Sequence, residues 1–532
     1  MRNINLEHYL LTIEKSVRTN WEHPALSDYQ EDTRYTYGEM AMEVERVKEW
    51  MSRMGIRKGD KIAICAKSCA HWGISFLSIV TSGCVAVSIL PDFTEENINY
   101  LVRHSEAKLL FVGESVNRKT AGTDFGGTIV VNLEKWEVVR GTDEQISQSQ
   151  SQDIDWHTGL EMDDIALINY TSGTTDKPKG VMLSSKALSS NVTYGLRGQP
   201  NGPGDQVLGM LPLAHIFGIM FDFLYQMAGG AHVVYLKKAP SPTLIMKAFR
   251  EVRPFMILTV PLLIEKIINS RVLPVFNKAA IKSLWLIPSF RSIIRRKISG
   301  KLMEAFGGKL RVMIIGGAPL NKEVENCLSK LRFPFTCGYG MTECAPLICY
   351  ASPETLNAGS VGRAVDGIEI KINSDEPERK PGEILVRGDN VFVGYFANED
   401  ATNKAFDKNG WFHTGDMGIM DRHGNLTLKG RCKNMILGPS GQNIYPEEIE
   451  AKLLTMPRVQ ETIVIARDKK IIALVYPDSK GISKDELRLV MGENLAALNE
   501  SLPKYSQVAK IELVEKEFEK TPKNSIKRFL YK

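Results

Sequence analysis

Helical and strand patterns alternate through most of the first 430 residues of this 532-residue chain. Gly59–Cys65 is typical of a turn that enters a buried strand, and Arg311–Leu320 of a strand that ends in a glycine turn. Such alternation predicts an α/β fold in which helices cover largely parallel sheets. Ligands of such sheets usually bind beyond the carboxyl ends of the strands, so we expect a binding site there. The chain is too long for one hydrophobic core, and two or three domains are expected.

The pattern changes after Gly362, where short β-like segments follow one another. They are Ile368–Ile372, Gly382–Val386 and Leu426–Lys429. Gly430–Asn434 looks like a domain boundary, because the segment beyond it has an alternation of its own. That last segment predicts, in order, helix 447–454, strand 461–466, strand 471–476 and helix 484–496.

The composition excludes several classes of protein. Hydrophobic content of 43% and charged content of 24% are those of an ordinary soluble globular protein. The formal charge of +5 arises from 67 basic and 62 acidic residues and does not indicate nucleic-acid binding. The eight cysteines form no CxxC pair and no metal-ligand spacing, so we expect reduced thiols in a cytoplasmic protein. The N-terminus has no apolar core of the kind that a signal peptide needs.

One uncharged run, Trp72–Leu90, is long enough to suggest a membrane span. Glycine and hydroxyl residues interrupt this run, and Ser82-Gly83 is placed as a helix stop. A buried helix followed by a strand over Val85–Leu90 is therefore the preferred interpretation.

The loop Tyr170–Gly180 carries the strongest chemical signal. It contains two glycines, four serine or threonine hydroxyls and two lysines between two apolar segments. Backbone N–H groups and hydroxyls in such a loop can surround phosphate oxygens, and lysines balance their negative charge. It is not a Walker A loop, because no Gly-Lys-Ser/Thr opens a helix. A polar surface loop without a ligand is the simpler alternative.

Four further segments support the phosphate interpretation by their spelling and their order. The full set is Tyr170–Gly180, Leu211–Gly218, Gly338–Glu343, Gly410–Asp416, and Gly430–Lys433 with Asn443–Glu450. This set resembles the adenylate-forming superfamily of acyl-CoA synthetases, luciferases and peptide-synthetase adenylation domains. The similarity covers nearly the whole chain, and long-chain fatty acyl-CoA synthetases are the most similar group.

The resemblance implies an acid–thiol ligase that works in two steps. A carboxylate attacks the α-phosphate of ATP to give an acyl-adenylate and pyrophosphate, and the thiol of coenzyme A then displaces AMP. Because an anion attacks a polyanion, the first step needs Mg²⁺ and positive groups. The resemblance also implies a large N-terminal domain, residues 1–430, with a β-rich subdomain over about 350–430. A small mobile α+β C-terminal domain, residues 431–532, would rotate about a hinge near Lys433.

Motif positions then imply roles for individual residues. The β- and γ-phosphates would be held by Thr171, Ser172, Gly173, Thr174, Thr175 and Lys179. The adenine pocket would be formed by Gly316, Gly317, Ala318 and Pro319, with Tyr339 stacked on the base and Gly340 and Met341 also binding the nucleotide. Thr342 would donate to the α-phosphate, and Glu343 would hold Mg²⁺ together with Thr174. Asp416 would accept from both ribose hydroxyls, Arg431 would reach the ribose or phosphate, and His215 would line the junction between carboxylate and phosphate.

Simpler alternatives exist for several of these residues. Thr342-Glu343 alone would be a helix N-cap, Asp416 a turn residue and His215 a partly buried histidine with its hydrogen bonds satisfied. Asp176 stands where many members of the superfamily have glycine, and a carboxylate there either weakens nucleotide binding or points outward.

The C-terminus departs from the superfamily pattern. Its members have a lysine that reaches the active site during adenylation, and alignment of Ile526 and Arg528 places Ser525 at that position. Losing one such electrostatic contact typically lowers the rate on the order of 10²–10³-fold. Lys523 is the preferred substitute and Lys527 the alternative, since Lys523 would share a strand face with Ser525. Two other functions stay open: transfer of the acyl-adenylate to a carrier protein, and binding of nucleotide or acyl group without turnover.

The acyl substrate is indicated only indirectly, and medium- or long-chain fatty acids are the expectation. Segment 266–303 has nine lysines and arginines, interleaved with aromatic and aliphatic residues, and no acidic residue. Such a segment either rests on the inner face of an anionic membrane as a peripheral contact or is a solvated helix face over an apolar groove. Monomer and homodimer are both compatible with the sequence.

Overall fold

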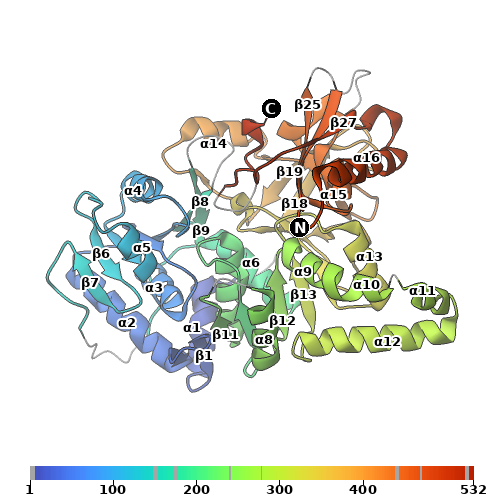
Figure 1. Cartoon of the computed structure of the whole chain (residues 1–532). Coiled ribbons are helices and arrows are strands. Elements are labelled where there is room, and N and C mark those ends of the chain that lie inside the picture. Colours follow the sequence, from blue (N-terminus) through green and yellow to red (C-terminus); the bar gives the residue numbers. More distant parts are fainter. Residues whose placement is uncertain are drawn as a thin grey trace.

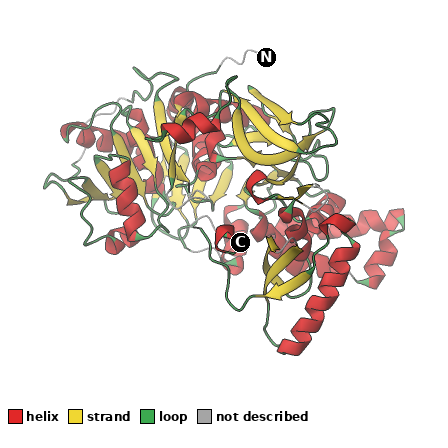
Figure 2. Ribbon diagram, turned by 90° about the horizontal axis from the view of Figure 1, so that it is seen from above, coloured by secondary structure: helices red, strands yellow, loops and turns green. Residues whose placement is uncertain are grey.

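The computed structural model describes residues 6–147, 154–171, 178–238, 241–276, 278–437, 443–467, 470–521 and 526–531. Two large sheets with helices around them make up most of the molecule (Figures 1 and 2). Their strands are largely parallel, and a separate C-terminal unit follows the large N-terminal part. The expected α/β fold class is therefore confirmed.

The first large sheet has seven strands, and only its edge pair β1–β2 is antiparallel. In spatial order the strands are β14 (Phe335–Cys337), β13 (Val312–Ile315), β12 (Met256–Thr259), β10 (Gln206–Gly209), β11 (His232–Tyr235), β1 (Pro24–Asp28) and β2 (Arg34–Thr36).

The second large sheet has eight strands, with antiparallel pairs only towards its two edges. In spatial order they are β20 (Gly394–Tyr395), β9 (Lys179–Ser184), β8 (Ile165–Thr171), β4 (Val85–Ser88), β3 (Lys61–Cys65), β5 (Leu109–Val112), β6 (Ile129–Asn132) and β7 (Glu137–Arg140). Because β20 comes from the β-rich region, that region is joined to the second sheet by backbone pairing.

Helices connect the strands and cover the sheets. They are α1 (Tyr9–Thr19), α2 (Tyr37–Arg53), α3 (Ala70–Thr81), α4 (Glu95–His104), α5 (Glu114–Lys119), α6 (Ser185–Gly198), α7 (Tyr225–Gly229), α8 (Pro242–Val252), α9 (Pro261–Ile267), α10 (Leu273–Phe276), α11 (Ala279–Trp285), α12 (Pro288–Ala305), α13 (Lys322–Leu331) and α14 (Glu399–Ala405). Short π-helical turns lie at Gly218–Leu224 and Ile268–Val272, and 3₁₀ turns at Thr342–Cys344 and Cys432–Asn434.

Local sequence explains why these elements begin and end where they do. The Thr36 side chain accepts from the Glu39 N–H while Glu39 accepts from the Thr36 N–H, and this capping box starts α2. The run Trp72–Leu90 forms the buried helix α3 and strand β4, as expected. No helix among the described residues is both long and apolar enough to cross a membrane.

The β-rich region contains two antiparallel sheets. The four-stranded sheet consists of β18 (Ile368–Asn373), β19 (Gly382–Gly388), β21 (Phe412–Met420) and β22 (Leu426–Arg431). The three-stranded sheet consists of β15 (Tyr339–Gly340), β16 (Leu347–Tyr350) and β17 (Arg363–Ala364). The β-like segments expected after Gly362 are thus confirmed as β18, β19 and β22.

The C-terminal segment builds its own small sheets and core. Its elements are β23 (Ile436–Leu437), β24 (Asn443–Ile444), α15 (Pro446–Leu453), β25 (Val459–Arg467), β26 (Lys470–Pro477), α16 (Lys484–Glu500) and β27 (Lys510–Leu513), with 3₁₀ turns at Lys504–Ser506 and Arg528–Leu530. Ile449 and Leu453 of α15 pack with Val464 of β25 and Ala473 of β26. The expected helices and strands are present, whereas the boundary at 430 and the hinge at Lys433 stay predictions.

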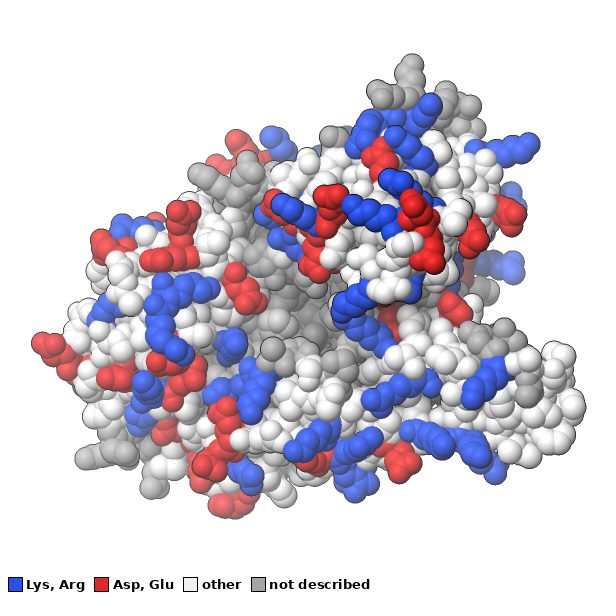
Figure 3. All heavy atoms as spheres, in the orientation of Figure 1, with Lys and Arg blue, Asp and Glu red and all other residues white. Residues whose placement is uncertain are grey.

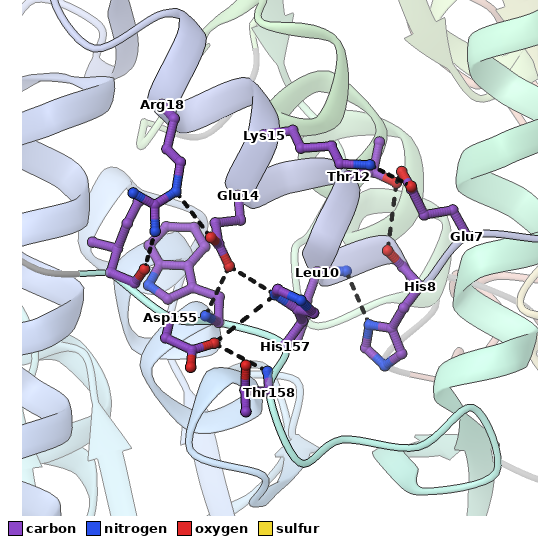
Figure 4. A network of polar contacts seen from close by, with 12 residues as sticks. Glu7, His8, Leu10, Thr12, Glu14, Lys15, Arg18, Asp155, His157 and Thr158 are labelled. Carbon is purple, nitrogen blue, oxygen red and sulfur yellow. Dashed lines mark hydrogen bonds and ion pairs between the residues drawn. The ribbon is translucent and has the colours of Figure 1, made fainter.

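The Glu14 side chain connects α1 to the segment that precedes β8 through hydrogen bonds (Figure 4). Its carboxylate accepts from Arg18 Nε at 2.9 Å, Trp156 N at 3.0 Å and His157 Nδ1 at 2.9 Å. Asp155 lies close by, so the three side chains Glu14, Asp155 and His157 have the composition of a metal site. Because three donors already satisfy Glu14, we interpret the cluster as a structural tether.

Candidate active site

A pocket opens where the carboxyl ends of β12 and β13 meet the β-rich region. Its empty space, the open mouth included, is about 810 Å³. The lining residues are mostly apolar or aromatic, and among those described none is a lysine, an arginine or a carboxylate. They are Tyr194, Gly195, Gly198, Gln199, His215, Phe217, Phe221, Tyr225, Met256, Leu258, Ile314, Gly316, Gly317, Gly338, Tyr339, Gly340, Met341, Pro346, Leu347 and Tyr350.

His215 stands in the pocket wall on the loop between β10 and the π-helical turn. Its Nδ1 accepts from the Phe217 N–H at 3.2 Å, so a neutral ring carries its proton on Nε2. The start of the loop is fixed from below by buried Asp222, which accepts from Met210 N at 3.2 Å and Leu211 N at 3.0 Å. The loop thus has a defined shape, and the histidine is part of the pocket.

The glycine turn after β13 forms another part of the wall. Gly317 has a φ of +88°, a left-handed conformation that favours glycine. A Cβ at Gly316 would lie 3.2 Å from the Phe217 ring, so a side chain there would press on the pocket. Gly316 and Gly317 line the pocket, whereas Ala318 and Pro319 are exposed and do not line it.

Tyr339 connects this wall to the four-stranded sheet. Its ring lines the pocket, and its hydroxyl donates to Asp416 Oδ2 at 2.8 Å. Arg431 faces Asp416 across the β21–β22 pair, and its Nε lies 2.8 Å from Asp416 Oδ1. Burial raises the pKa of Asp416 above its usual value, while Arg431 and the Tyr339 hydroxyl act in the opposite direction. Asp416 therefore has both carboxylate oxygens engaged by donors, one from Tyr339 and one from Arg431.

Glu343 follows Thr342 in the 3₁₀ turn and is partly exposed, whereas Thr342 is buried. The Tyr395 hydroxyl donates to Glu343 Oε1 at 3.0 Å. Burial, with Glu343 nearby, raises the pKa of Tyr395, so this hydroxyl stays protonated. The Lys179 ammonium lies 4.8 Å from the centre of the Tyr395 ring. Tyr395 therefore contacts a cation with its ring and a carboxylate with its hydroxyl.

The loop Tyr170–Gly180, which is expected to bind phosphate, is only partly described. Thr171 and Lys179 are opposite each other at the ends of β8 and β9, so the two strands bring the ends of the loop together. Ser172, Gly173, Thr174 and Thr175 lie outside the described residues, and so do Asp176, Lys523 and Ser525.

The structure therefore brings His215, Gly317, Tyr339, Gly340 and Met341 into one wall, with Asp416 and Arg431 joined to it through Tyr339. Their roles in binding or catalysis stay predictions. Sequence analysis missed most of the apolar wall, including Tyr194, Gln199, Phe221, Tyr225 and Tyr350. It also missed Tyr395, although Gly394-Tyr395 stands near the end of a β-like stretch that could have drawn attention to it.

Comparison with known proteins gives matches along the chain. The AMP-binding enzyme family matches residues 13–396, and the AMP-binding enzyme C-terminal domain matches residues 433–531. A long-chain-fatty-acid–CoA ligase, FadD15 of Mycobacterium bovis, is 27% identical over 479 residues, which cover 84% of this chain and 78% of that protein. The 4-coumarate–CoA ligase of Vanilla planifolia is 27% identical over 496 residues, which cover 87% of this chain and 83% of that protein.

A solved structure agrees with this result. The O-succinylbenzoate coenzyme A synthetase MenE from Bacillus subtilis, in complex with ATP and magnesium ion, has a TM-score of 0.76 and 25% sequence identity. The alignment covers 97% of this chain and 98% of that one. These findings confirm the adenylate-forming resemblance and, at the level of the family, the expected use of ATP, Mg²⁺ and coenzyme A. The chain belongs to the AMP-binding enzyme family, whose domain spans residues 13–396.

Proposed function

We propose that this protein is an ATP-dependent fatty acid–CoA ligase that acts on medium- or long-chain acids. One observation carries the proposal: a single pocket is lined both by expected nucleotide residues and by a group of apolar side chains, whose part of the pocket we call the chamber. Gly317 and Tyr339 are among the expected nucleotide residues, and Phe221, Met256 and Leu258 line the apolar chamber. An acyl chain in the chamber would have its carboxylate near His215, at the side where the nucleotide is expected.

The chemistry of the chamber favours an acid with a single carboxylate. The described residues that line it include no lysine or arginine, so a second carboxylate at the far end of the substrate would be buried without a partner. An alkyl chain, by contrast, gains about 0.8 kcal/mol for each methylene that is removed from water. The relatives act on different acids by their names, so this point rests on the pocket alone.

The residues around the pocket would share the work of adenylation. Lys179 would balance phosphate charge, and Asp416 would bind the ribose after Tyr339 and Arg431 give up their contacts with it. His215 would orient the carboxylate through the N–H on Nε2. Glu343 would hold Mg²⁺, with Thr174 as a second oxygen ligand, and the ion would neutralise charge on the phosphates. A partly exposed carboxylate whose neighbour is a neutral phenol fits such an ion.

Two assays test the proposal directly. Purified protein with ATP, Mg²⁺ and a fatty acid should release pyrophosphate, and addition of coenzyme A should give the thioester. Asp416→Ala should abolish both, while Asp375→Ala, a change in an exposed turn between β18 and β19, should leave both unchanged. Pyrophosphate release without thioester would favour transfer to a carrier protein. Nucleotide binding without pyrophosphate would favour a protein that binds its ligands without turnover.

A second substrate class is favoured by one contact in the wall. Gln199 Nε2 donates to the Tyr350 hydroxyl at 3.2 Å, and this amide and phenol could instead bond to a hydroxyl on an aromatic acid. The relative from Vanilla planifolia is a 4-coumarate–CoA ligase by name. Values of kcat/KM for acids from acetate to oleate, measured beside 4-coumarate, separate the two classes. A rise with chain length supports the fatty acid, and a maximum at 4-coumarate contradicts it.

A further inference from the structure

A helical arm, residues 278–301, projects from the side of the N-terminal part. It consists of α11 and most of α12, which run away from the body and end in a turn at its far end (Figure 1). None of the described side chains between Lys278 and Lys301 is fully buried, and the first buried one is Leu302. The arm therefore contributes little to the hydrophobic core. Packing in the core does not explain why the arm has so many apolar side chains.

Two side-chain contacts support the turn at the end of the arm. Arg291 Nε donates to the Trp285 carbonyl at 2.9 Å, which closes the C-terminus of α11 against the first turn of α12. The Trp285 ring meets the Phe276 ring edge to face, with their centres 4.8 Å apart. These two contacts hold the turn between α11 and α12 at the end of the arm.

Large apolar side chains are exposed at this turn, the tip of the arm. Leu286 is 76% exposed and Ile293 62%, and Ile287 and Phe290 are nearly half exposed. All four lie within the turn and the first turns of α12. Four aliphatic or aromatic side chains grouped at the end of a projection are unusual for a surface that faces only water.

Positive charge follows directly behind the tip. Arg295, Arg296, Lys297 and Lys301 lie on α12, and no acidic residue occurs between Glu265 and Glu304. Of the ion pairs among the described residues, none involves these four side chains. In the space-filling view basic side chains line the shaft of the arm, and the described atoms that are visible at its far end are mostly uncharged (Figure 3).

The chain leads from the pocket wall towards the arm. Met256 and Leu258 of β12 line the chamber, and the chain passes from β12 through α9 and α10 into the arm. Val260 and Leu262, at the start of this path, are 42% and 50% exposed.

We propose that the arm docks the protein on an anionic lipid bilayer. The apolar tip around Leu286 and Phe290 enters the region between headgroups and acyl chains, and the cations of α12 contact lipid phosphates. An apolar tip followed by unpaired cations matches the two layers of such a membrane in order and in charge. A second copy of this chain would bring like charges together along the shaft, which is why the membrane is the favoured occupant. Docking does not depend on the proposed ligase activity, although it would suit a lipid substrate.

Vesicle flotation of the full chain, without ATP, tests the proposal. Vesicles of phosphatidylcholine alone are compared with vesicles that also contain phosphatidylglycerol, at low and high NaCl. We expect flotation with the anionic vesicles that weakens as salt rises. The triple variant Arg295→Gln/Arg296→Gln/Lys297→Gln should bind on the order of a hundredfold more weakly, because each cation near such a surface contributes about 1 kcal/mol. Leu286→Ser/Phe290→Ser should weaken binding on the order of tenfold and leave the remainder more salt-sensitive.

A matched control carries the same change of charge elsewhere. Lys371, Lys404 and Lys408 are exposed on the β-rich region, and their triple change to glutamine should float as the wild type does. Trypsin digestion of the wild type gives a second measurement that needs no variant. Cleavage within 278–301 should be slowed by anionic vesicles and unaffected by neutral ones.

Several outcomes would overturn the proposal. They are flotation that is equal on neutral and anionic vesicles, flotation that the arm variants leave unchanged, and no flotation together with unchanged trypsin cleavage. Self-association that the tip variant abolishes, in the absence of vesicle binding, would identify a second copy as the occupant instead. Loss of pyrophosphate release concerns the proposed function and has no bearing on these results.

Discussion

At the scale of single residues, Tyr395 connects Glu343 with Lys179, the two residues expected to bind Mg²⁺ and phosphate. Its hydroxyl donates to Glu343 and its ring lies beside the Lys179 ammonium. Tyr395→Phe keeps the ring and removes the donor, so Glu343 would no longer be held in one orientation. A hydrogen bond to a charged group contributes about 1.5–3 kcal/mol, and we therefore expect the Mg²⁺ concentration for half-maximal pyrophosphate release to rise on the order of tenfold or more.

Tyr505→Phe is the control for this change, because Tyr505 is 46% exposed in the C-terminal segment. It should leave the Mg²⁺ dependence as in the wild type. An unchanged dependence in Tyr395→Phe would show that the hydroxyl does not position the carboxylate.

Asp222 is a second residue whose surroundings predict a measurable effect. It is fully buried, its Oδ1 has no partner among the described residues, and burial raises its pKa from 3.8 to about 7. The folded state therefore keeps the proton when the unfolded chain has lost it. As the pH rises from about 4 to 7, this group lowers the free energy of unfolding, and above about 7 the loss is complete.

Asp222→Asn removes this titration while retaining an acceptor for the Met210 and Leu211 N–H groups. Relative to the wild type, the variant should gain on the order of 3 kcal/mol in free energy of unfolding between pH 5 and pH 8. Urea unfolding at both values measures the change. A difference between variant and wild type that is the same at both pH values would contradict the assigned titration.

At the scale of elements, local signals were enough for most of the chain. Strands β18 and β19 and helices α15 and α16 follow from apolar periodicity and turn residues. The apolar chamber could not be found in this way. Gln199 follows α6, Phe221 lies in a π-helical turn and Tyr350 ends β16, so residues distant in sequence meet only after folding. In the sequence Phe221 and Tyr350 look like core residues, and Gln199 looks like an ordinary polar residue after a helix.

Helix α6 offers an element-scale test of the chamber. Gly195 and Gly198 both line the pocket, but a Cβ at Gly195 would lie 2.8 Å from the Tyr225 ring, and one at Gly198 meets nothing within 4 Å. Gly198→Leu should therefore fold and occupy part of the chamber. Each methylene of the substrate that no longer fits in the chamber forgoes about 0.8 kcal/mol of burial free energy. We therefore expect kcat/KM for long acids to fall on the order of a hundredfold relative to short ones.

Gly492→Leu is the matched control, because this exposed glycine of α16 also has open space around it and lies in the C-terminal segment. Its chain-length profile should equal that of the wild type. Gly195→Ala should lower the melting temperature instead, since the methyl group displaces the Tyr225 ring. A uniform loss over all chain lengths in Gly198→Leu would place the acyl chain elsewhere.

At the scale of the whole molecule, the superfamily resemblance implies that the C-terminal segment supplies a positive group to a site in the N-terminal part. Of the two lysines that could do so, Lys527 is held within its own segment: its Nζ lies 3.4 Å from Glu519 Oε2 and its N–H donates to the Glu519 carbonyl. The neighbouring Arg528 is paired with buried Glu450 of α15, which also accepts from Val464 N at 2.6 Å. These contacts bind the end of the chain to the C-terminal sheet and leave Lys527 with a local partner.

We therefore expect Lys523→Ala to slow pyrophosphate release on the order of 10²–10³-fold and Lys527→Ala to change it only a few-fold. Ser525→Lys, which restores the lysine of the superfamily pattern, should rescue Lys523→Ala. Thioester formation from preformed acyl-adenylate should be unchanged in all three variants, because the lysine is needed only while ATP is the electrophile. Loss of pyrophosphate release in Lys527→Ala with full activity in Lys523→Ala would assign the charge to the other lysine, and the end of the chain would then have to leave Glu519 during the first step.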